Sequence, residues 1–143
     1  MDKGLNYLAL ARKAGLAELG EEPVGGAARA GKAYAILVAS DASDHTWRRA
    51  KSFAAGTEQQ CIRLPYTKDE LGQAIGRDAL AMGAVTDVSL ALALVKALPE
   101  QEKYKDALEV LERKSQKAKK RQAEAKAHAR NVRTGKKKHE IKK

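Results

Sequence analysis

The chain has 143 residues, of which 43% are apolar, and it carries a formal net charge of +10 at neutral pH. No apolar run approaches the roughly 20 residues that a membrane span needs, and the N-terminus lacks the apolar stretch of a signal peptide. Cys61 is the only cysteine, which excludes an intramolecular disulfide. These features favour a cytoplasmic protein with one domain of ordinary size.

The first half of the chain alternates between helical and strand patterns. Apolar residues at helical spacing run from residue 5 to the glycine at 15, and a short edge strand is expected over residues 16–19. A second helix begins at Glu21 and closes at Gly31. The unbroken apolar run over residues 33–39 predicts a central strand covered on both faces. Asp41 or Ser43 caps the next helix, which ends near residue 55.

The second half repeats this alternation. Residues 60–64 are the next strand candidate, and Thr67 with Glu70 forms a capping box for a short helix that stops at Gly76. A further strand is expected over residues 81–86, followed by a strongly apolar helix over residues 87–98 that a proline ends. The alternation predicts a three-layer α/β/α sandwich over residues 1–98, with one more packing helix over residues 99–112.

Charge divides the chain at residue 113. Residues 1–112 hold 14 basic and 16 acidic side chains, whereas residues 113–143 hold 14 basic side chains and two glutamates, a net charge of +12. We expect this basic tail to be a solvated helix over residues 113–128 and disordered over residues 129–143. Its charge favours a nucleic-acid partner, because cations that neutralise phosphates release counterions. A membrane is disfavoured because no apolar face accompanies the charges, and a purely solubilising tail is the alternative.

No constellation for catalysis, metal binding or cofactor binding is found, so the chain is not expected to be an enzyme. Cys61 and His45 would form a nucleophile–base pair only if the fold brought them together, and Cys61 is expected to be a buried structural thiol. No metal-ligand spacing occurs among His and Cys. Trp47 is expected in the core, with the cations of residues 48–51 on the solvated face of its helix, and a binding patch is the alternative.

Four stretches also carry a family resemblance, namely residues 8–15, 30–43, 70–76 and 84–87. With these motifs the chain resembles the kink-turn-binding ribosomal-protein superfamily known by the labels L-seven-Ae and L-thirty-e, and most of all its small bacterial members, the YlxQ-like proteins. The resemblance covers about residues 3–98. It implies an α/β/α sandwich with a small mixed sheet.

The resemblance also implies an RNA site at the start of the second helix and in the loop before the last strand. In the family this helix start brings a glycine, an Asn-Glu pair and a basic residue one turn later. The matching positions here are Gly20, Glu22, Pro23 and Gly26. A carboxylate cannot donate the hydrogen bonds of an Asn amide, and it repels phosphate. The free N–H groups of the helix start remain available to an anion.

The sequence therefore predicts an RNA-binding, ribosome-associated protein that contacts structured, kink-turn-like RNA. Its partners would be ribosomal RNA and other ribosomal or assembly proteins. The main alternative on the same fold is a protein–protein adaptor without sequence-specific RNA reading. A third is the substrate-recognition domain of an RNA methyltransferase, whose catalytic domain would lie on a separate chain.

The residues expected to contact RNA fall into two groups. Those of the body surround the expected family site, and we expect Lys32 and Arg77 to border the same end of the sheet: Gly20, Glu21, Glu22, Gly26, Lys32, Arg77, Leu80, Ala81 and Met82. Those of the tail would bind phosphates: Lys119, Lys120, Arg121, Arg130, Arg133, Lys136, Lys137 and Lys138.

Overall fold

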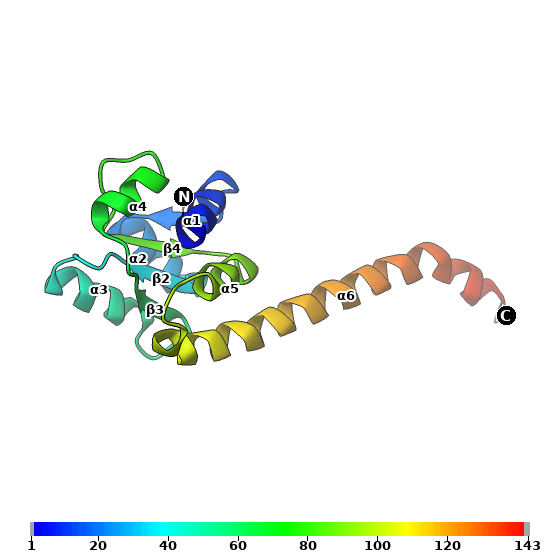
Figure 1. Ribbon diagram of the computed structural model, residues 1–143. Coiled ribbons are helices and arrows are strands. Elements are labelled where there is room, and N and C mark those ends of the chain that lie inside the picture. The colour runs from blue at the N-terminus through cyan, green and yellow to red at the C-terminus, as the bar shows by residue number, and fades with distance from the viewer. Residues whose placement is uncertain (1, 142–143) are drawn as a thin grey trace.

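The computed structural model describes the backbone of residues 2–141 and the side chains of residues 2–129. Helices and strands alternate as the sequence predicts, and a long helix then leaves the body (Figure 1). The elements are α1 (Lys3–Lys13), β1 (Ala17–Leu19), α2 (Glu21–Arg29), β2 (Ala35–Val38), α3 (Asp44–Ala54), β3 (Gln60–Arg63), α4 (Lys68–Ala74), β4 (Met82–Val85), α5 (Val88–Lys96), the 3-10 helix η1 (Gln101–Tyr104) and α6 (Lys105–Ile141).

The four strands form one mixed sheet in the order β1-β4-β2-β3. β2 pairs with β3 in parallel, whereas β4 is antiparallel to both β1 and β2. Every residue of β2 and β4 is buried, which confirms the prediction of a central strand covered on both faces. The register gives the sheet two ends. We call one the Gly20 end (Leu19, Val38, Arg63 and Met82) and the other the Lys32 end (Ala17, Ala35, Gln60 and Val85).

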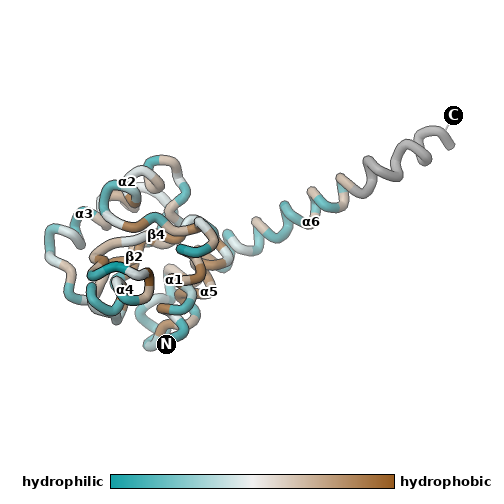
Figure 2. Tube along the Cα trace, turned by 90° about the horizontal axis from the view of Figure 1, so that it is seen from above, coloured by the Kyte–Doolittle hydropathy of each residue, from teal (hydrophilic) through white to brown (hydrophobic). Residues whose placement is uncertain are grey.

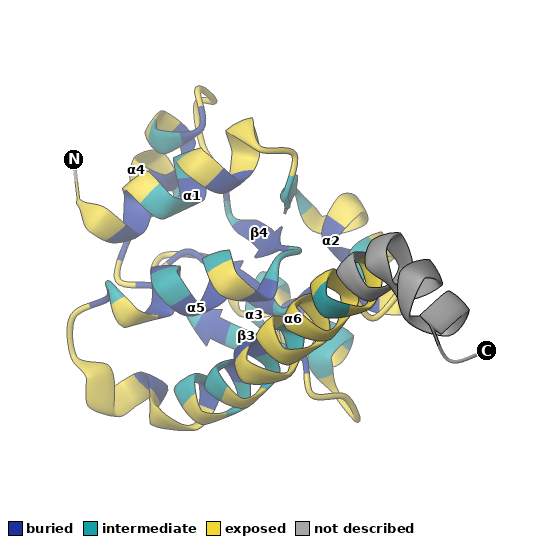
Figure 3. Ribbon diagram, turned by 90° about the vertical axis from the view of Figure 1, so that its right-hand side faces the viewer, coloured by how far each residue is buried: buried dark blue, intermediate teal, exposed yellow. Residues whose placement is uncertain are grey.

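Helices cover both faces of this sheet. α2 and α3 pack against one face, while α1, α5 and the beginning of α6 pack against the other, so the fold is the expected three-layer sandwich (Figure 3). α4 contacts α1 and follows β3 at the Gly20 end. The largest fully buried side chains are Leu, Ile, Val and Met, and alanines such as Ala33, Ala35 and Ala39 fill the remaining core positions.

The caps found in the sequence begin the predicted helices. Ser43 is the N-cap of α3 and accepts a hydrogen bond from the Thr46 N–H at 3.2 Å. Thr67 and Glu70 exchange both hydrogen bonds of a capping box at the start of α4. Such caps satisfy N–H groups that the helix itself leaves without an acceptor.

α6 packs on the body for longer than the sequence predicts. Leu111 and Ser115 are 0% and 1% exposed, and Ala118 still packs against the core, so the packed part continues about two turns past residue 112. From Lys119 to Lys126 the described side chains are exposed. The predicted disorder over residues 129–143 falls almost wholly on residues whose side chains the structure does not describe, and it stays a prediction.

Candidate nucleic-acid interface

The start of α2 lies at the Gly20 end of the sheet. Gly20 is the N-cap with φ 103° and ψ 160°, a conformation that L side chains rarely adopt, and its N–H donates to the Met82 C=O at 2.9 Å. The Val24 N–H closes the first turn on the Gly20 C=O at 3.0 Å. Pro23 has no N–H, so this helix start offers only the N–H groups of Glu21 and Glu22, which have no acceptor among the described residues.

Two carboxylates stand beside these N–H groups. Glu21 and Glu22 are exposed, and the Glu21 carboxylate pairs with the Arg49 guanidinium of α3 at 3.4 Å. Arg49 also lies over the Phe53 ring, 5.1 Å from its centroid. Acidic side chains stabilise a helix start through the helix dipole, but they repel a phosphate. The start of α2 therefore attracts an anion less strongly than its free N–H groups alone would.

The paired glycines of α2 have different roles. A Cβ on Gly25 would come within 3.0 Å of the Phe53 ring, so the absence of a side chain allows α2 and α3 to approach closely. A Cβ on Gly26 would meet nothing within 4 Å. Gly26, one turn into the helix, is thus open to a larger side chain without any change in packing.

The loop before β4 offers less surface than the sequence predicts. Leu80 and Met82 are 4% and 2% exposed and belong to the core, so the expectation that their side chains contact RNA is wrong. Ala81 is half-buried, and its C=O accepts from the Ala39 N–H at 3.0 Å. Burial removes these side chains from the surface because β4 is a central strand with helices on both faces.

Lys32 and Arg77 do not border the same end of the sheet, which corrects the sequence-based expectation. Lys32 precedes β2 at the Lys32 end, beyond the far end of α2 from Gly20. Arg77 is exposed in the connection from α4 to β4, where its N–H donates to the Gly72 C=O at 2.8 Å. This connection enters β4 at the Gly20 end.

The described part of α6 beyond Ala118 carries several exposed basic side chains. α6 starts near the Gly20 end, where the Tyr104 hydroxyl donates to the Arg63 C=O at 3.4 Å, and runs past β3 to the Lys32 end. Beyond the body it is mostly hydrophilic (Figure 2). Lys119, Lys120 and Arg121 are exposed there. The tail residues Arg130, Arg133, Lys136, Lys137 and Lys138 lie outside the part whose side chains the structure describes.

Glu58 forms ion pairs that link α6 to the body, a contact that no local sequence pattern predicts. Its carboxylate pairs with the Lys114 ammonium at 3.2 Å and with the Arg113 guanidinium. The hydrogen bond from Lys114, followed by the charges of Lys114 and Arg113, lowers the pKa of this carboxyl. A groove of about 300 Å³ beside the pair is also lined by Arg29, next to the Lys32 end.

The described residues offer little for catalysis. No group of three or more His, Cys, Asp or Glu side chains among them is placed to hold a metal ion. Cys61 is half-buried rather than fully buried, and burial raises the pKa of its thiol to about 11, the opposite of an activated nucleophile. His45 is exposed in the first turn of α3. No helix in the described part of the chain is both long enough and apolar enough to cross a membrane.

Comparison with known proteins identifies relatives of this chain. No protein-family model matches the chain. It is 34% identical over 83 residues to the RNA-binding protein YlxQ of Enterococcus faecium, a match that covers 58% of this chain and 80% of that protein. Its fold resembles that of a protein with unknown function from Bacillus halodurans C, with a TM-score of 0.64 and 28% identity over 70% of this chain and 100% of the other.

The three layers and the mixed four-stranded sheet define the class of small α/β/α sandwich proteins. Within this class, the chain belongs to the YlxQ family, a bacterial branch of the L-seven-Ae family. Since the whole of the Bacillus halodurans chain matches only 70% of this one, about three tenths of this chain has no counterpart in that structure.

Proposed function

We propose that this chain binds structured RNA, and that the basic part of α6 supplies most of the affinity. One observation carries the proposal: the net charge of +12 is confined to residues 113–143, and the described cations beyond Ala118 are exposed on a helix that leaves a nearly neutral body. Such a cationic helix binds phosphates by releasing counterions. The name of its Enterococcus faecium relative, an RNA-binding protein, supports the same partner.

The start of α2 is the second contact that we propose, for a kinked RNA of the kink-turn type. Its support is the pair of free N–H groups at Glu21 and Glu22, which together with the helix dipole attract an anion. The two carboxylates oppose this contact. We therefore expect the α2 contact to add selectivity for a kinked backbone and only a small part of the affinity.

A designed gain of affinity tests the α2 contact. In the double variant Glu22→Asn with Gly26→Lys, an amide donor replaces the carboxylate and a cation appears one turn later, at a position with room for it. If α2 faces RNA, binding of a kink-turn RNA should strengthen by at least the factor of about 5–8 that one added phosphate contact gives at 0.1 M salt. Glu22→Asn with Gly26→Gln is the matched control without the added charge. Unchanged affinity would place RNA elsewhere on the molecule.

We also propose that the chain associates with ribosomes. We expect the full chain to co-sediment with ribosomal particles in a sucrose gradient at low salt and to leave them as salt rises, because phosphate contacts weaken with salt. Purified protein should carry nucleic acid, seen as a raised ratio of absorbance at 260 and 280 nm that a high-salt wash lowers. Protein that is free of nucleic acid and of ribosomal particles at low salt would favour the adaptor alternative.

A further inference from the structure

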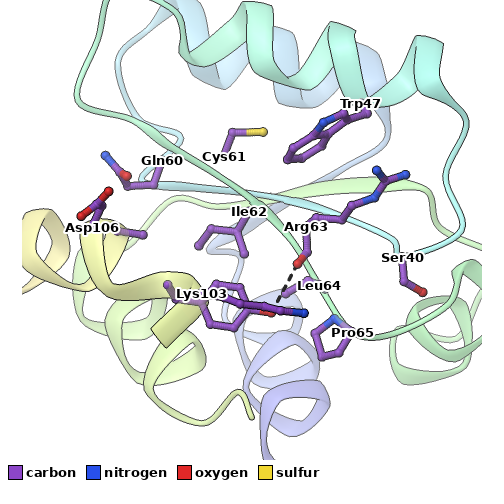
Figure 4. Close-up of a pocket in the computed structure, with 12 residues that line it drawn as sticks. Ser40, Trp47, Gln60, Cys61, Ile62, Arg63, Leu64, Pro65, Lys103 and Asp106 are labelled. Atoms are coloured by element: carbon purple, nitrogen blue, oxygen red, sulfur yellow. Dashed lines mark hydrogen bonds between the residues drawn. The ribbon is translucent and has the colours of Figure 1, made fainter. Parts of the chain in front are cut away.

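The outer edge of β3 is open, and it forms the floor of a groove between α3 and the η1–α6 segment (Figure 4). We propose that this groove binds an extended, acidic peptide, which adds to the sheet as a fifth strand beside β3. The proposal goes beyond RNA binding and does not depend on it. It gives the chain a site for a protein partner.

The backbone of β3 has hydrogen-bonding groups to spare. The Gln60 and Leu64 N–H groups donate to β2 and its flank, to the Tyr34 C=O at 3.2 Å and the Val38 C=O at 2.8 Å. Because neighbouring residues of a strand alternate in direction, Cys61 and Arg63 direct their N–H and C=O groups outward. The Tyr104 hydroxyl, which reaches the Arg63 C=O from outside the sheet, agrees with this direction.

Three of these outward groups lack a partner among the described residues: the N–H and the C=O of Cys61 and the N–H of Arg63. They are the groups that an added strand pairs with. Proteins usually protect an exposed sheet edge from pairing with another chain by charged side chains, β-bulges or a covering element. At β3 the covering elements stand on either side and leave the edge itself at the bottom of the groove.

The groove has side walls on both sides of the β3 edge. Its volume is about 480 Å³. Trp47 of α3 lies on one side of the groove (Figure 4). Tyr104 and Ala107, which also line it, belong to the η1–α6 segment on the other side. The floor between them includes Ile62, which is buried, and the neutral thiol of Cys61. Walls on both faces of an added strand supply the pockets that give a strand-addition site its side-chain preferences.

Charge indicates which peptide fits. On the α3 side, the Lys51 ammonium and the Arg63 guanidinium lie 5.3 and 5.2 Å from the centre of the Trp47 ring. The Arg63 Nε is buried without a hydrogen-bond partner, the one such side-chain atom in the described part of the chain. The Arg63 Nη2 already donates to the Ala42 C=O at 2.9 Å, so an incoming carboxylate would bond the remaining N–H groups of this guanidinium. Acidic side chains should therefore face α3, and apolar ones should face Tyr104.

The same contacts disfavour the other occupants. A stacked RNA base would need the Trp47 ring, which two cations already approach. A second copy of this chain paired through β3 would add its own Arg63 to the same short edge and bring no excess of acidic side chains from β3, so charge does not favour it. Arg63 and Lys103 outnumber Asp106, the carboxylate that lines the groove, so an acidic peptide is the occupant whose charge matches it.

The test uses the full-length chain and the peptide acetyl-VEVEV-amide. Trp47 is the only tryptophan, so its fluorescence reports occupancy of the groove directly. We expect a saturable change, and at least tenfold weaker binding of acetyl-VKVKV-amide. Two N-methylated analogues, one blocked at both glutamate amides and one at the valine amides, should differ at least tenfold, because only one alternating set of N–H groups can face β3.

Two variants separate the site from the rest of α3. Arg63→Gln should weaken the peptide at least fivefold, whereas Arg48→Gln, an exposed cation of α3 that does not line the groove, should leave its affinity unchanged. Circular dichroism checks that both variants are folded. Equal binding of the two N-methylated analogues, or no saturable change with any peptide, would overturn the proposal. So would a fluorescence change produced instead by single-stranded RNA or by dimerisation in sedimentation.

Discussion

Neutralising three neighbouring cations of α6 gives the sharpest test of how this chain binds RNA. The triple variant Lys119→Gln, Lys120→Gln and Arg121→Gln lies one residue past Ala118, where packing on the body ends. All three side chains are exposed, and glutamine is a good helix former. The change should therefore remove charge without altering the packing of α6 or the stability of the sandwich.

The size of the effect follows from counterion release. Each phosphate contact contributes about 0.7 to 0.9 to the slope of log affinity against log salt. With about six contacts from the tail, raising salt from 50 to 200 mM should weaken wild-type binding roughly 300- to 2000-fold. Removing three contacts should lower the slope by about 2 to 3 and weaken binding at 0.1 M salt by roughly 100- to 500-fold.

Fluorescence anisotropy with a labelled kink-turn RNA, titrated at several salt concentrations, measures affinity and slope together. The matched control is the triple variant Lys3→Gln, Arg12→Gln and Lys13→Gln, which removes three exposed cations from α1 and should leave the slope nearly unchanged. Urea unfolding checks that neither variant loses stability. If the α6 variant keeps the wild-type slope, or the α1 variant loses as much, α6 is not the main phosphate contact.

Three further predictions concern single residues. Gly72→Ala should cost about 1–3 kcal/mol in urea unfolding, because its Cβ would lie 2.6 Å from backbone of the loop before β4, whereas Gly26→Ala should be neutral or stabilising by up to about 1 kcal/mol. Glu58→Gln should strengthen RNA binding about 5- to 8-fold at 0.1 M salt, because it raises the net charge by one where the carboxylate pairs with two cations of α6; weaker binding would contradict this. The Tyr66 hydroxyl donates to the Asp2 carboxylate and lowers its pKa, so this bond stabilises the fold above the ordinary pKa of about 4 and is lost as pH falls through the lowered value. Tyr66→Phe should thus be less stable than wild type at pH 6, and the gap should narrow at pH 3 and below; a gap independent of pH would refute the link.

The fold could be predicted because its signals are local. The apolar run at residues 33–39 specifies a buried strand through its own composition, and β2 occupies its centre. Ser43 and Thr67 cap helices with hydrogen bonds to N–H groups only three residues away. Such signals can be recognised in the sequence alone, because each N-cap and the N–H group that it bonds lie within one helical turn.

The candidate sites depend on contacts that no local pattern contains. Glu58 and Arg113 are separated by 55 positions, and nothing near either residue predicts that they meet. Leu80 and Met82 read as loop and strand-end residues, but the antiparallel pairing of β4 with β1 and β2 places them in the core. Strand order also decides that β3, which has both polar and apolar residues, is an edge. These features depend on the order and pairing of the strands in the sheet, which the succession of helices and strands along the chain does not specify.

The path of α6 separates the two proposed RNA contacts. α6 passes β3 from Tyr104, near the Gly20 end, to Glu58, just before the Lys32 end, and then leaves the body. Its exposed cations therefore project from the end of the sheet opposite the acidic start of α2. Arg29, which lines a groove together with Lys114 of α6, extends the cationic surface onto the body. An RNA held by α6 should consequently meet the sandwich first at the Lys32 end, and only an RNA long enough to cross the sheet can also reach Gly20. The effect of the α2 variant should therefore depend on RNA length. A short duplex should bind through α6 alone, so its affinity should not change in the variant Glu22→Asn with Gly26→Lys.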